Sequence, residues 1–344
     1  MSFLFPSSTI TLEAALRDLA GGSPRARAAA AHALGDVTEP AEKRRAAEAL
    51  IAALEDERAE VRAEACASLG GLREEAALAQ LVRRLDDGAP AVRQNAAIAL
   101  GTIGHEGGFA PLAAALRDGP ADLRFQAATS LAEIDAPRAF EPLVAALGDG
   151  DPQVAGAAAL ALGAIGDKRA IEHLAPLVEH AEPAVRFDAA YALAELGDPA
   201  GRATLVGGLG DPERAWDAVT ALATLGSPDD ADVLGRALTN RRVPPEATVL
   251  AAGTLLRVAP ASAHGGAARR VLLAALGSRK TNVRGLAVEQ LGALGTAGAW
   301  GKEPLEKLAR SGKGGEVLEQ IASALRAIDA LDADEPEGAA GEPR

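Results

Sequence analysis

The residues that most often carry enzyme chemistry are few in this sequence and lie apart. Its 344 residues include one cysteine and five histidines. Cys66 has no evident base partner, so a small buried filler is its expected role. His173 and His180 are seven residues apart with only Glu179 and Glu182 near them, which is a weak pattern for a metal site. We therefore predict no catalytic residue, no metal and no cofactor.

Charge is distributed unevenly along the chain, which points to binding rather than to catalysis. The net charge is −13 at pH 7, and this argues against a general nucleic-acid coat, because such a coat needs many cationic side chains. Residues 233–288 nevertheless contain nine Lys or Arg and one acidic residue, a local net charge of +8. The basic segment is therefore a candidate contact surface within an acidic protein.

The elements that must position these residues follow from an internal repeat. The pair Val61-Arg62 is followed, at a constant step of 31 residues, by related pairs that begin at Val92, Leu123 and Val154. Ten units are present with spacings of 29 to 36 residues, and the variation falls between units, where loops can absorb it. A leucine stands seven residues after the arginine position of each unit: Leu34, Leu69, Leu100, Leu131, Leu162, Leu193, Leu222, Leu255, Leu291 and Leu325.

Each unit is predicted to contain two helices, helix A and then helix B, which carries the arginine position. The apolar and small residues of helix B fall on one face at the helical period. Alanine stands three residues after the arginine position in nine of the ten units, which lets neighbouring helices approach closely. Prolines such as Pro90 and Pro152 lie near the start of helix B, and glycines such as Gly104 and Gly166 follow its end.

One helix pair cannot bury its own apolar face, so the pairs are predicted to stack into one continuous all-α domain over residues 1–330. Residues 3–5 are apolar and are expected to cap the first unit. Residues 331–344 form an acidic tail without apolar anchors, which we expect to be disordered. The predicted units lie near 9–37, 40–73, 75–104, 106–135, 137–166, 168–197, 199–226, 228–259, 263–295 and 300–330.

The unit that contains DGDPQV at 149–154 and ALALGAIGD at 159–167 resembles a HEAT repeat. The resemblance is greatest to the short HEAT-like repeats of phycobilin lyase subunits, and it covers residues 9–330. It implies a right-handed α-solenoid of about ten stacked HEAT-like helix pairs. It also implies a structural ladder between neighbouring units, interrupted at Ala155 and His180. The ladder residues would be Asp56, Asp87, Asp118 and Asp149 with Arg62, Arg93 and Arg124.

This resemblance favours a non-enzymatic scaffold or adaptor that binds a protein partner through its shape. A phycobilin lyase-like subunit that handles a chromophore is the alternative, although the sequence has no lyase-specific motif. The related deoxyhypusine hydroxylases bind two irons through several His-Glu dipeptides, and only His105-Glu106 is present here. HEAT-like glycosylases bind nucleic acid through a basic concave face, whereas the corresponding face here is apolar and acidic.

The predicted binding surface is the side of helix B opposite the core, which lines the concave face of a HEAT stack. Exposed aromatic residues with an acidic rim are typical of recognition surfaces and would suit a helix or peptide with apolar anchors and basic flanks. The alternative is that tight curvature buries these side chains against the adjacent helix B. The predicted groove residues are Ile98, Phe125, Thr129, Leu160, Phe187, Asp188, Tyr191, Glu195, Trp216 and Asp217.

A second predicted surface is a basic edge within units 8 and 9. Arg241-Arg242 and Arg279-Lys280 both lie in turns between helix A and helix B, so they should share one edge of the stack. A phosphate-rich partner would fit these four side chains. The alternatives are a solvated edge or attraction to the acidic half of a second copy, and the sequence does not give the oligomeric state.

No segment of the sequence predicts export or membrane insertion. The longest run without a charged residue, 152–166, has 15 residues, whereas roughly 20 are needed to span a bilayer. The first six residues contain no basic segment and no long apolar core, so we expect no secretory signal. A cytoplasmic location is the resulting expectation.

Overall fold

The structure, a computed structural model, describes residues 11–311 and 314–330. All the regular secondary structure within these ranges is helical, with twenty α-helices that form ten successive A and B pairs. The all-α class and the ten helix pairs are therefore confirmed. The predicted tail at 331–344 and the predicted cap at 3–5 lie outside the described residues. That residues 1–330 form one domain stays a prediction.

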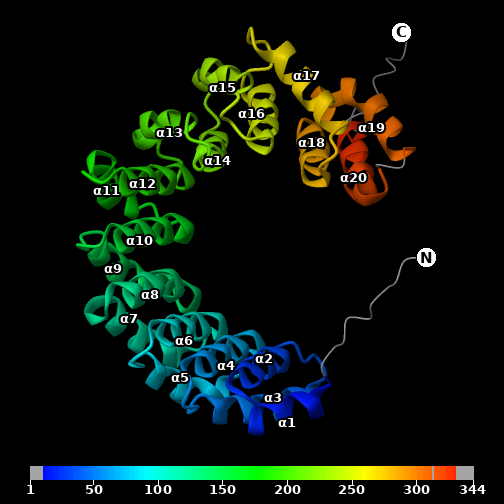
Figure 1. The fold of residues 1–344 in the computed structure, drawn as a ribbon. Helices are drawn as coiled ribbons and strands as arrows, with labels where there is room; N and C mark the ends of the chain where they lie inside the picture. The colour runs from blue at the N-terminus through cyan, green and yellow to red at the C-terminus, as the bar shows by residue number, and fades with distance from the viewer. Residues whose placement is uncertain (1–10, 312–313, 331–344) are drawn as a thin grey trace, which may run out of the picture. The chain divides into compact units, whose positions relative to one another are not determined.

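Helix packing groups the chain into two compact units, Met1–Ala192 and Leu193–Arg344, with the boundary inside α12. In the first unit, short 3₁₀ segments precede α5 and α7 and follow α11, at Glu75–Ala77, Glu106–Gly108 and Ala175–Glu179. The α-helices of this unit are α1 (Leu12–Gly21), α2 (Pro24–Gly35), α3 (Pro40–Ala53), α4 (Ala59–Leu72), α5 (Leu78–Arg84), α6 (Pro90–Ile103), α7 (Phe109–Asp118), α8 (Ala121–Ile134), α9 (Ala136–Ala146), α10 (Pro152–Ile165), α11 (Ala170–Leu174) and α12 (Pro183–Glu195) (Figure 1).

The second unit continues the same alternation of A and B helices. Its 3₁₀ segments are Pro199–Gly201, Pro228–Asp230, Gly295–Gly301 and Gly315–Val317. Its α-helices are α13 (Arg202–Gly208), α14 (Ala215–Leu225), α15 (Ala231–Ala237), α16 (Pro245–Val258), α17 (Gly265–Leu276), α18 (Thr281–Ala293), α19 (Lys302–Ala309) and α20 (Leu318–Asp329).

Within each unit, the B helices of neighbouring repeats pack on one another. In the first unit α2, α4, α6, α8 and α10 contact one another in this order, and in the second α14, α16, α18 and α20 do so. Nine of the A helices pack on the B helix of their own repeat, as α7 does on α8 and α17 on α18 (Figure 1). Each pair therefore buries its apolar face against its neighbours, as the repeat pattern predicts.

The core of both units is built from the predicted leucine column. Leu34, Leu162 and Leu255 have no exposed surface, and the nine leucines up to Leu291 are all buried. The prediction is wrong for Leu325, which is half-buried. Its helix, α20, buries Ile321, Ala324 and Ile328, which stand three, six and ten residues after the arginine position, so most of the predicted inward face is kept.

Helix ends follow the predicted proline and glycine positions. Pro90 and Pro152 occupy the first positions of α6 and α10, where the missing N–H is not needed. Gly104 follows α6 with φ of +71°, a left-handed conformation that favours glycine. Arg73 holds the equivalent position after α4 with φ of +53°, the one non-glycine residue with positive φ in the described ranges.

Small residues bring successive B helices of the first unit close together. A side-chain carbon added at Gly70 of α4 would lie 2.9 Å from the Cα of Ala99 in α6. One added at Gly101 would lie 2.7 Å from the Cβ of Ser130 in α8. These distances are shorter than van der Waals contact, so the spacing of the helices requires glycine at these positions. The repeat pattern thus includes a glycine eight residues after the arginine position.

An arginine of helix B ties each of several repeats to the next. Arg62 donates from Nε and Nη2 to the two carboxylate oxygens of Asp87 at 2.8 and 2.7 Å, and from Nη1 to the carbonyl of Asp56. Arg124 pairs with Asp149 in the same way, at 2.7 Å for both bonds. Hydrogen bonding by Arg62 holds the pKa of Asp87 below its usual range, against the effect of burial.

The ladder differs from the prediction at Asp118. Arg93 pairs at 2.9 Å with Asp122, and Asp118 instead forms an exposed pair with Arg117. The reason is that α7 continues through Asp118 and leaves a short turn before α8, so an aspartate in the first turn of α8 occupies the place opposite Arg93. The ladder also includes a rung between Asp56 and Arg27, which occupies the arginine position of the first unit but was not among the predicted ladder residues.

Candidate partner-binding surface

Cys66 and His105, which were considered first as candidates for chemistry, have environments that fit a structural role. Cys66 is completely buried, and burial raises the pKa of its thiol to about 12, so it is protonated and unreactive at neutral pH. The Nδ1 atom of His105 accepts a hydrogen bond from the backbone N–H of Gly107 at 3.0 Å. Across residues 11–311 and 314–330, no three His, Cys, Asp or Glu side chains are grouped so that they could hold a metal ion.

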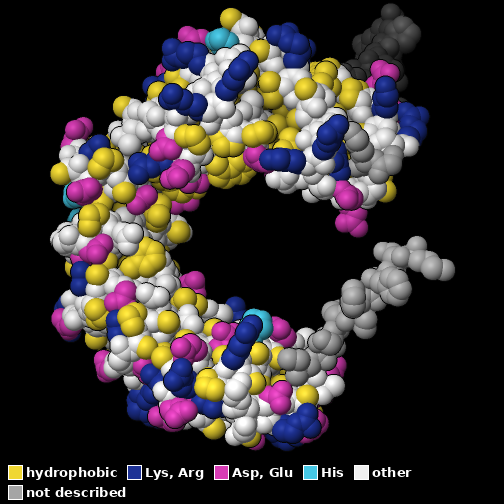
Figure 2. Space-filling view, viewed as in Figure 1, with side chains coloured by type: hydrophobic (Ala, Val, Ile, Leu, Met, Phe, Trp, Pro, Cys, Tyr) yellow, Lys and Arg dark blue, Asp and Glu magenta, His cyan; other side chains and the backbone are white. Residues whose placement is uncertain are grey.

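Three large apolar side chains are exposed on successive B helices of the first unit. Ile98 on α6, Phe125 on α8 and Leu160 on α10 have exposed fractions of 41, 38 and 37%. They occupy the first or fifth position after the arginine position, which is the side predicted to face away from the core. Figure 2 shows apolar side chains gathered over α8 and α10. An amphipathic helix would have polar residues on this side, so apolar residues here are not explained by packing of the core.

Two of these side chains border a hollow of about 550 Å³ between α8, α10 and α12. Phe125 and Leu160 form its apolar rim together with alanines of α10, and Thr129 and Asp188 are its predicted polar members. Thr129 is exposed and donates a hydrogen bond to the carbonyl of Gln126 at 2.9 Å. The structure therefore brings four predicted groove residues to one place, all within the first unit.

Phe187 does not lie where the sequence predicts. The ring is 5% exposed, so the expectation of an exposed aromatic residue is wrong here. Helices α10 and α12 approach closely at this level, since a side-chain carbon at Gly156 would overlap the carboxylate of Asp188. This close approach leaves little open surface on α12, where Asp188 and Tyr191 are half-buried. The alternative prediction, burial against the neighbouring repeat, describes Phe187 better.

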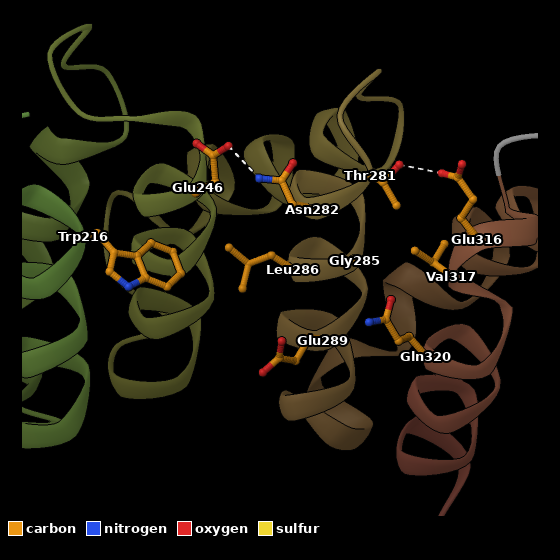
Figure 3. A pocket seen from close by; sticks show the side chains of 10 residues that line it. All are labelled: Trp216, Glu246, Thr281, Asn282, Gly285, Leu286, Glu289, Glu316, Val317 and Gln320. Carbon is orange, nitrogen blue, oxygen red and sulfur yellow. Dashed lines mark hydrogen bonds between the residues drawn. The ribbon is translucent and has the colours of Figure 1, made fainter. Parts of the chain in front are cut away.

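The remaining predicted groove residues belong to the second unit. Glu195 and Asp217 are exposed, and Trp216 on α14 is 40% exposed. Trp216 borders a hollow of about 470 Å³ whose other walls come from α16, α18, the 3₁₀ segment Gly315–Val317 and the start of α20 (Figure 3). Leu286 and Val317 add apolar surface to this hollow, and Glu246, Glu289 and Glu316 add carboxylates. The hollow combines an exposed indole with negative charge.

The three carboxylates of this hollow differ in how they are held. Glu246 accepts hydrogen bonds from Asn282 Nδ2 at 3.0 Å and from Lys280 Nζ at 3.5 Å. Glu316 accepts from Arg284 at 2.7 Å, and a hydrogen bond from Thr281 lowers its pKa. Glu289 has neither a hydrogen bond nor an ion pair from its side chain to any residue that the structure describes.

Sequence reasoning missed most residues of this hollow. Glu289 stands at the same fifth position that selects Leu160, so its place in the column was the available signal. Leu286 and Val317 gave no such signal, because they lie outside the two positions predicted to be exposed. The binding role of all the predicted groove residues stays a prediction.

The four residues of the predicted basic edge are exposed on the second unit. Arg241 and Arg242 lie between α15 and α16, and Arg279 and Lys280 lie between α17 and α18, as expected for turns that follow A helices. Figure 2 shows Lys and Arg side chains around this part of the unit. Lys280 forms an ion pair with Glu246, so part of the positive charge is already compensated. Its phosphate-binding role stays a prediction.

Membrane insertion has no candidate segment among the described helices: none of them is long and apolar enough to cross a bilayer. This finding agrees with the short uncharged runs of the sequence.

Comparisons with known proteins identify the repeat. The family model described as HEAT repeats matches residues 47–124, 109–182 and 176–253, which together cover more than half of the chain. A search of the curated proteins found no match.

Solved structures with stacked helix pairs are similar to this chain. Yeast importin-β, Kap95p, is 15% identical with a TM-score of 0.57, and the match covers 93% of this chain and 52% of Kap95p. The Escherichia coli protein YibA is 20% identical with a TM-score of 0.50, over 76% of this chain and 94% of YibA. The complex of CpcE and CpcF of phycocyanin lyase from Nostoc sp. PCC7120 is 26% identical with a TM-score of 0.40, over 79% of this chain and 98% of the matched chain.

Proposed function

The chain belongs to the HEAT-repeat family, and from this premise we propose that it is a non-enzymatic scaffold that binds a protein partner on the exposed face of its B helices. The observation that carries the proposal is the exposure of Ile98, Phe125 and Leu160 on three successive B helices. These large apolar side chains lie on the side of the B helices that faces away from the core, and more than a third of the surface of each is exposed to solvent. Such clusters are typical of surfaces that a partner covers.

The shape and composition of the first-unit hollow support this proposal. Phe125 and Leu160 stand on either side of small alanine residues, which leaves room for an inserted apolar side chain of a partner. Complete burial of a leucine or phenylalanine from a partner contributes roughly 1.5–3 kcal/mol. Several such insertions along consecutive helices would give a specific complex without a catalytic group.

The test compares capture of partners by the wild-type chain and by the double variant Phe125→Ala, Leu160→Ala. The bait is the full chain in extracts of the native host, and captured proteins are quantified by mass spectrometry. We expect a partner enriched by the wild-type chain to lose at least about tenfold in recovery with the double variant, because two exposed anchors are removed. Circular dichroism should show that the variant keeps its helix content.

The matched control is Leu273→Ala, which removes a similarly exposed leucine, 38% exposed, from helix α17. This control should capture the partner as well as the wild-type chain does. Equal capture by the double variant would contradict the proposal. A shift of the absorption spectrum on mixing the chain with a linear tetrapyrrole would favour the chromophore-handling alternative instead.

A further inference from the structure

We infer that the hollow beside Trp216 receives an arginine side chain of the partner, with its guanidinium over the indole and paired with the carboxylate of Glu289. The inference rests on the proposed function, because it specifies what the partner presents to the second unit. It adds a recognition chemistry, an arginine anchored on an aromatic ring, to a face described so far only as apolar and acidic.

The described part of the chain itself places arginines over aromatic rings. Arg138 lies 4.1 Å from the ring centre of Phe109, and Arg169 lies 4.3 Å from that of Phe140. In the second unit, Arg269 lies 5.3 Å from the ring centre of Trp300. A guanidinium over an aromatic face is attracted by the negative potential of the ring, and indole gives the strongest attraction. Trp216 has the same chemistry available on a ring that is 40% exposed.

The charge of the hollow favours a cation. Among its ten lining residues there are three glutamates and no lysine or arginine. Lys280 and Arg284 approach from outside the lining and pair with Glu246 and Glu316, so those two charges are partly compensated. Glu289 has no cationic nitrogen within 4.0 Å of its carboxylate among the described residues, so it is the carboxylate best able to pair with an incoming group.

The positions of the side chains fit a long side chain that is apolar along its stem and charged at its end. Leu286 and Glu289 are one helical turn apart on α18, and in Figure 3 both lie on the side that faces Trp216. Leu286 can contact the methylene groups of the arginine, as apolar surfaces do along such stems. The planar guanidinium can then stack flat on the indole and donate two parallel hydrogen bonds to a carboxylate, whereas an ammonium has no plane to stack and acts as a point charge.

Gly285 keeps the floor of the hollow open between its two halves. A side-chain carbon at this position would lie 3.0 Å from Oε1 of Gln320, which is closer than an ordinary contact. The glycine therefore leaves a shallow saddle between the Trp216 side and the Val317 side (Figure 3). A peptide backbone can cross this saddle while its arginine points toward Trp216.

The experiment uses a chain in which Trp300→Phe leaves Trp216 as the single tryptophan, since the sequence has two. Phenylalanine keeps an aromatic ring beneath Arg269. The probes are three pentapeptides with blocked ends, Gly-Leu-X-Leu-Gly, in which X is arginine, lysine or citrulline. Citrulline keeps the shape of arginine and removes its charge. Binding is followed at low ionic strength by the fluorescence of Trp216.

The arginine peptide should change the emission of Trp216 and bind about tenfold more tightly than the citrulline peptide, because only arginine supplies the charge. Glu289→Gln should weaken the arginine peptide by about five- to tenfold and leave the citrulline peptide unchanged. The matched control is Glu303→Gln, a substitution of another exposed glutamate, on α19, that is not part of the hollow. It should bind all three peptides as the parent chain does.

Equal affinity for arginine and citrulline, tighter binding of lysine than of arginine, or an unaltered arginine affinity in Glu289→Gln would each overturn the inference. Its failure is distinguishable from failure of the proposed function. If the peptides fail but Phe125→Ala, Leu160→Ala still abolishes capture of a partner, the scaffold function stands and only the arginine site is lost. If capture is unaffected and the peptides behave as expected, the first-unit surface is wrong and the arginine site remains.

Discussion

Two leucines of α10, two residues apart, have opposite environments. Leu162 belongs to the leucine column and has no exposed surface, whereas Leu160 is 37% exposed. Because both are leucines of one helix, comparing their substitutions separates the effect of a core leucine on stability from that of a surface leucine. The sequence pattern distinguishes them because the helical period places them on different faces.

Leu162→Ala should lower the free energy of unfolding by ~2–5 kcal/mol, because it leaves a cavity in a closely packed core. Leu160→Ala should change it by less than about 1 kcal/mol, since its side chain is already partly in contact with water. Urea unfolding followed by circular dichroism measures both values. A loss below half a kcal/mol for Leu162→Ala would mean that the leucine column is not part of the core.

The rung between Arg62 and Asp87 should make stability depend on pH. The carboxylate of Asp87 is 4% exposed, and Asp87→Asn should cost on the order of 3 kcal/mol at pH 7, because it leaves the arginine without its charged partner. The pKa of Asp87 is lowered in the folded chain, chiefly by hydrogen bonding to Arg62. Its contribution is therefore complete above the unfolded pKa, about 4, and is lost as the pH falls through the folded value.

Denaturant unfolding at several pH values between 2 and 7 measures this difference. The gap between the wild-type chain and Asp87→Asn should be constant above about pH 5 and should narrow below pH 4. Asp118→Asn is the control, because Asp118 forms only an exposed pair with its neighbour. A gap that does not narrow in acid would show that the charge of Asp87 does not act through this rung.

At the scale of the helix, glycine residues set the distance between neighbouring B helices. Gly70 and Gly71 are adjacent in α4, yet only Gly70 faces α6. A side-chain carbon at Gly70 would lie within 3.0 Å of Ala99, and one at Gly71 would meet nothing within 4 Å. Glycine thus has a packing role at one position and none at the next.

Gly70→Ala should lower the free energy of unfolding by roughly 1–3 kcal/mol, because the two helices would have to separate. Gly71→Ala should raise it by about 0.5–1 kcal/mol, since alanine favours the helix and meets no neighbour. Thermal unfolding of the two variants, compared with the wild-type chain, gives both signs. A stabilising Gly70→Ala would contradict the close contact between α4 and α6.

The end of α4 offers a complementary substitution. Arg73 has a left-handed backbone conformation, with φ of +53° and ψ of +46°, at the position where other repeats have glycine. Arg73→Gly should stabilise the chain by about 1 kcal/mol, because glycine adopts this conformation without steric cost. The unfolding temperature of Arg73→Gly should therefore rise. An equal rise in Arg58→Gly, a substitution at the start of the same helix, would argue against this explanation.

Helix pairs were predictable from sequence, whereas neighbour-dependent features were not. The leucine column and the cap glycines follow from periodicity and local geometry, and both are confirmed up to Leu291. The predictions that Asp118 joins the ladder and that Phe187 is exposed were wrong. Each depends on how the adjacent helix is placed, which the repeat pattern does not specify. The hollow beside Trp216 was missed for the same reason, since Leu286 and Val317 come from different helices.

At the scale of the whole molecule, the principal helix contacts within the described part of each unit join helices of the same repeat or of neighbouring repeats. In the first unit α4 packs on α2 and α6, and neither α8 nor α10 belongs to its principal contacts. Stability in such a stack is approximately the sum of repeat and interface contributions. A change at one repeat should therefore be felt mainly by the two next to it.

Leu69→Ala should raise the rate of amide hydrogen exchange in α2, α4 and α6 at least about tenfold more than in α10, because the lost core contacts are local. Hydrogen exchange followed by mass spectrometry resolves these helices through their peptides. Uniform acceleration across the first unit would instead show that its repeats open as one cooperative block.

The arginine ladder has a mechanical consequence for the first unit. Arg27, Arg62, Arg93 and Arg124 each link the B helix of one repeat to an aspartate in, or just after, the A-to-B turn of the next repeat. The next arginine position is occupied by Ala155, which cannot form an ion pair. The aspartate position of the following repeat is occupied by His180. A force that pulls the repeats apart would therefore be resisted by ion pairs between repeats as far as the turn before α10. The first repeats to separate would be those just beyond α10.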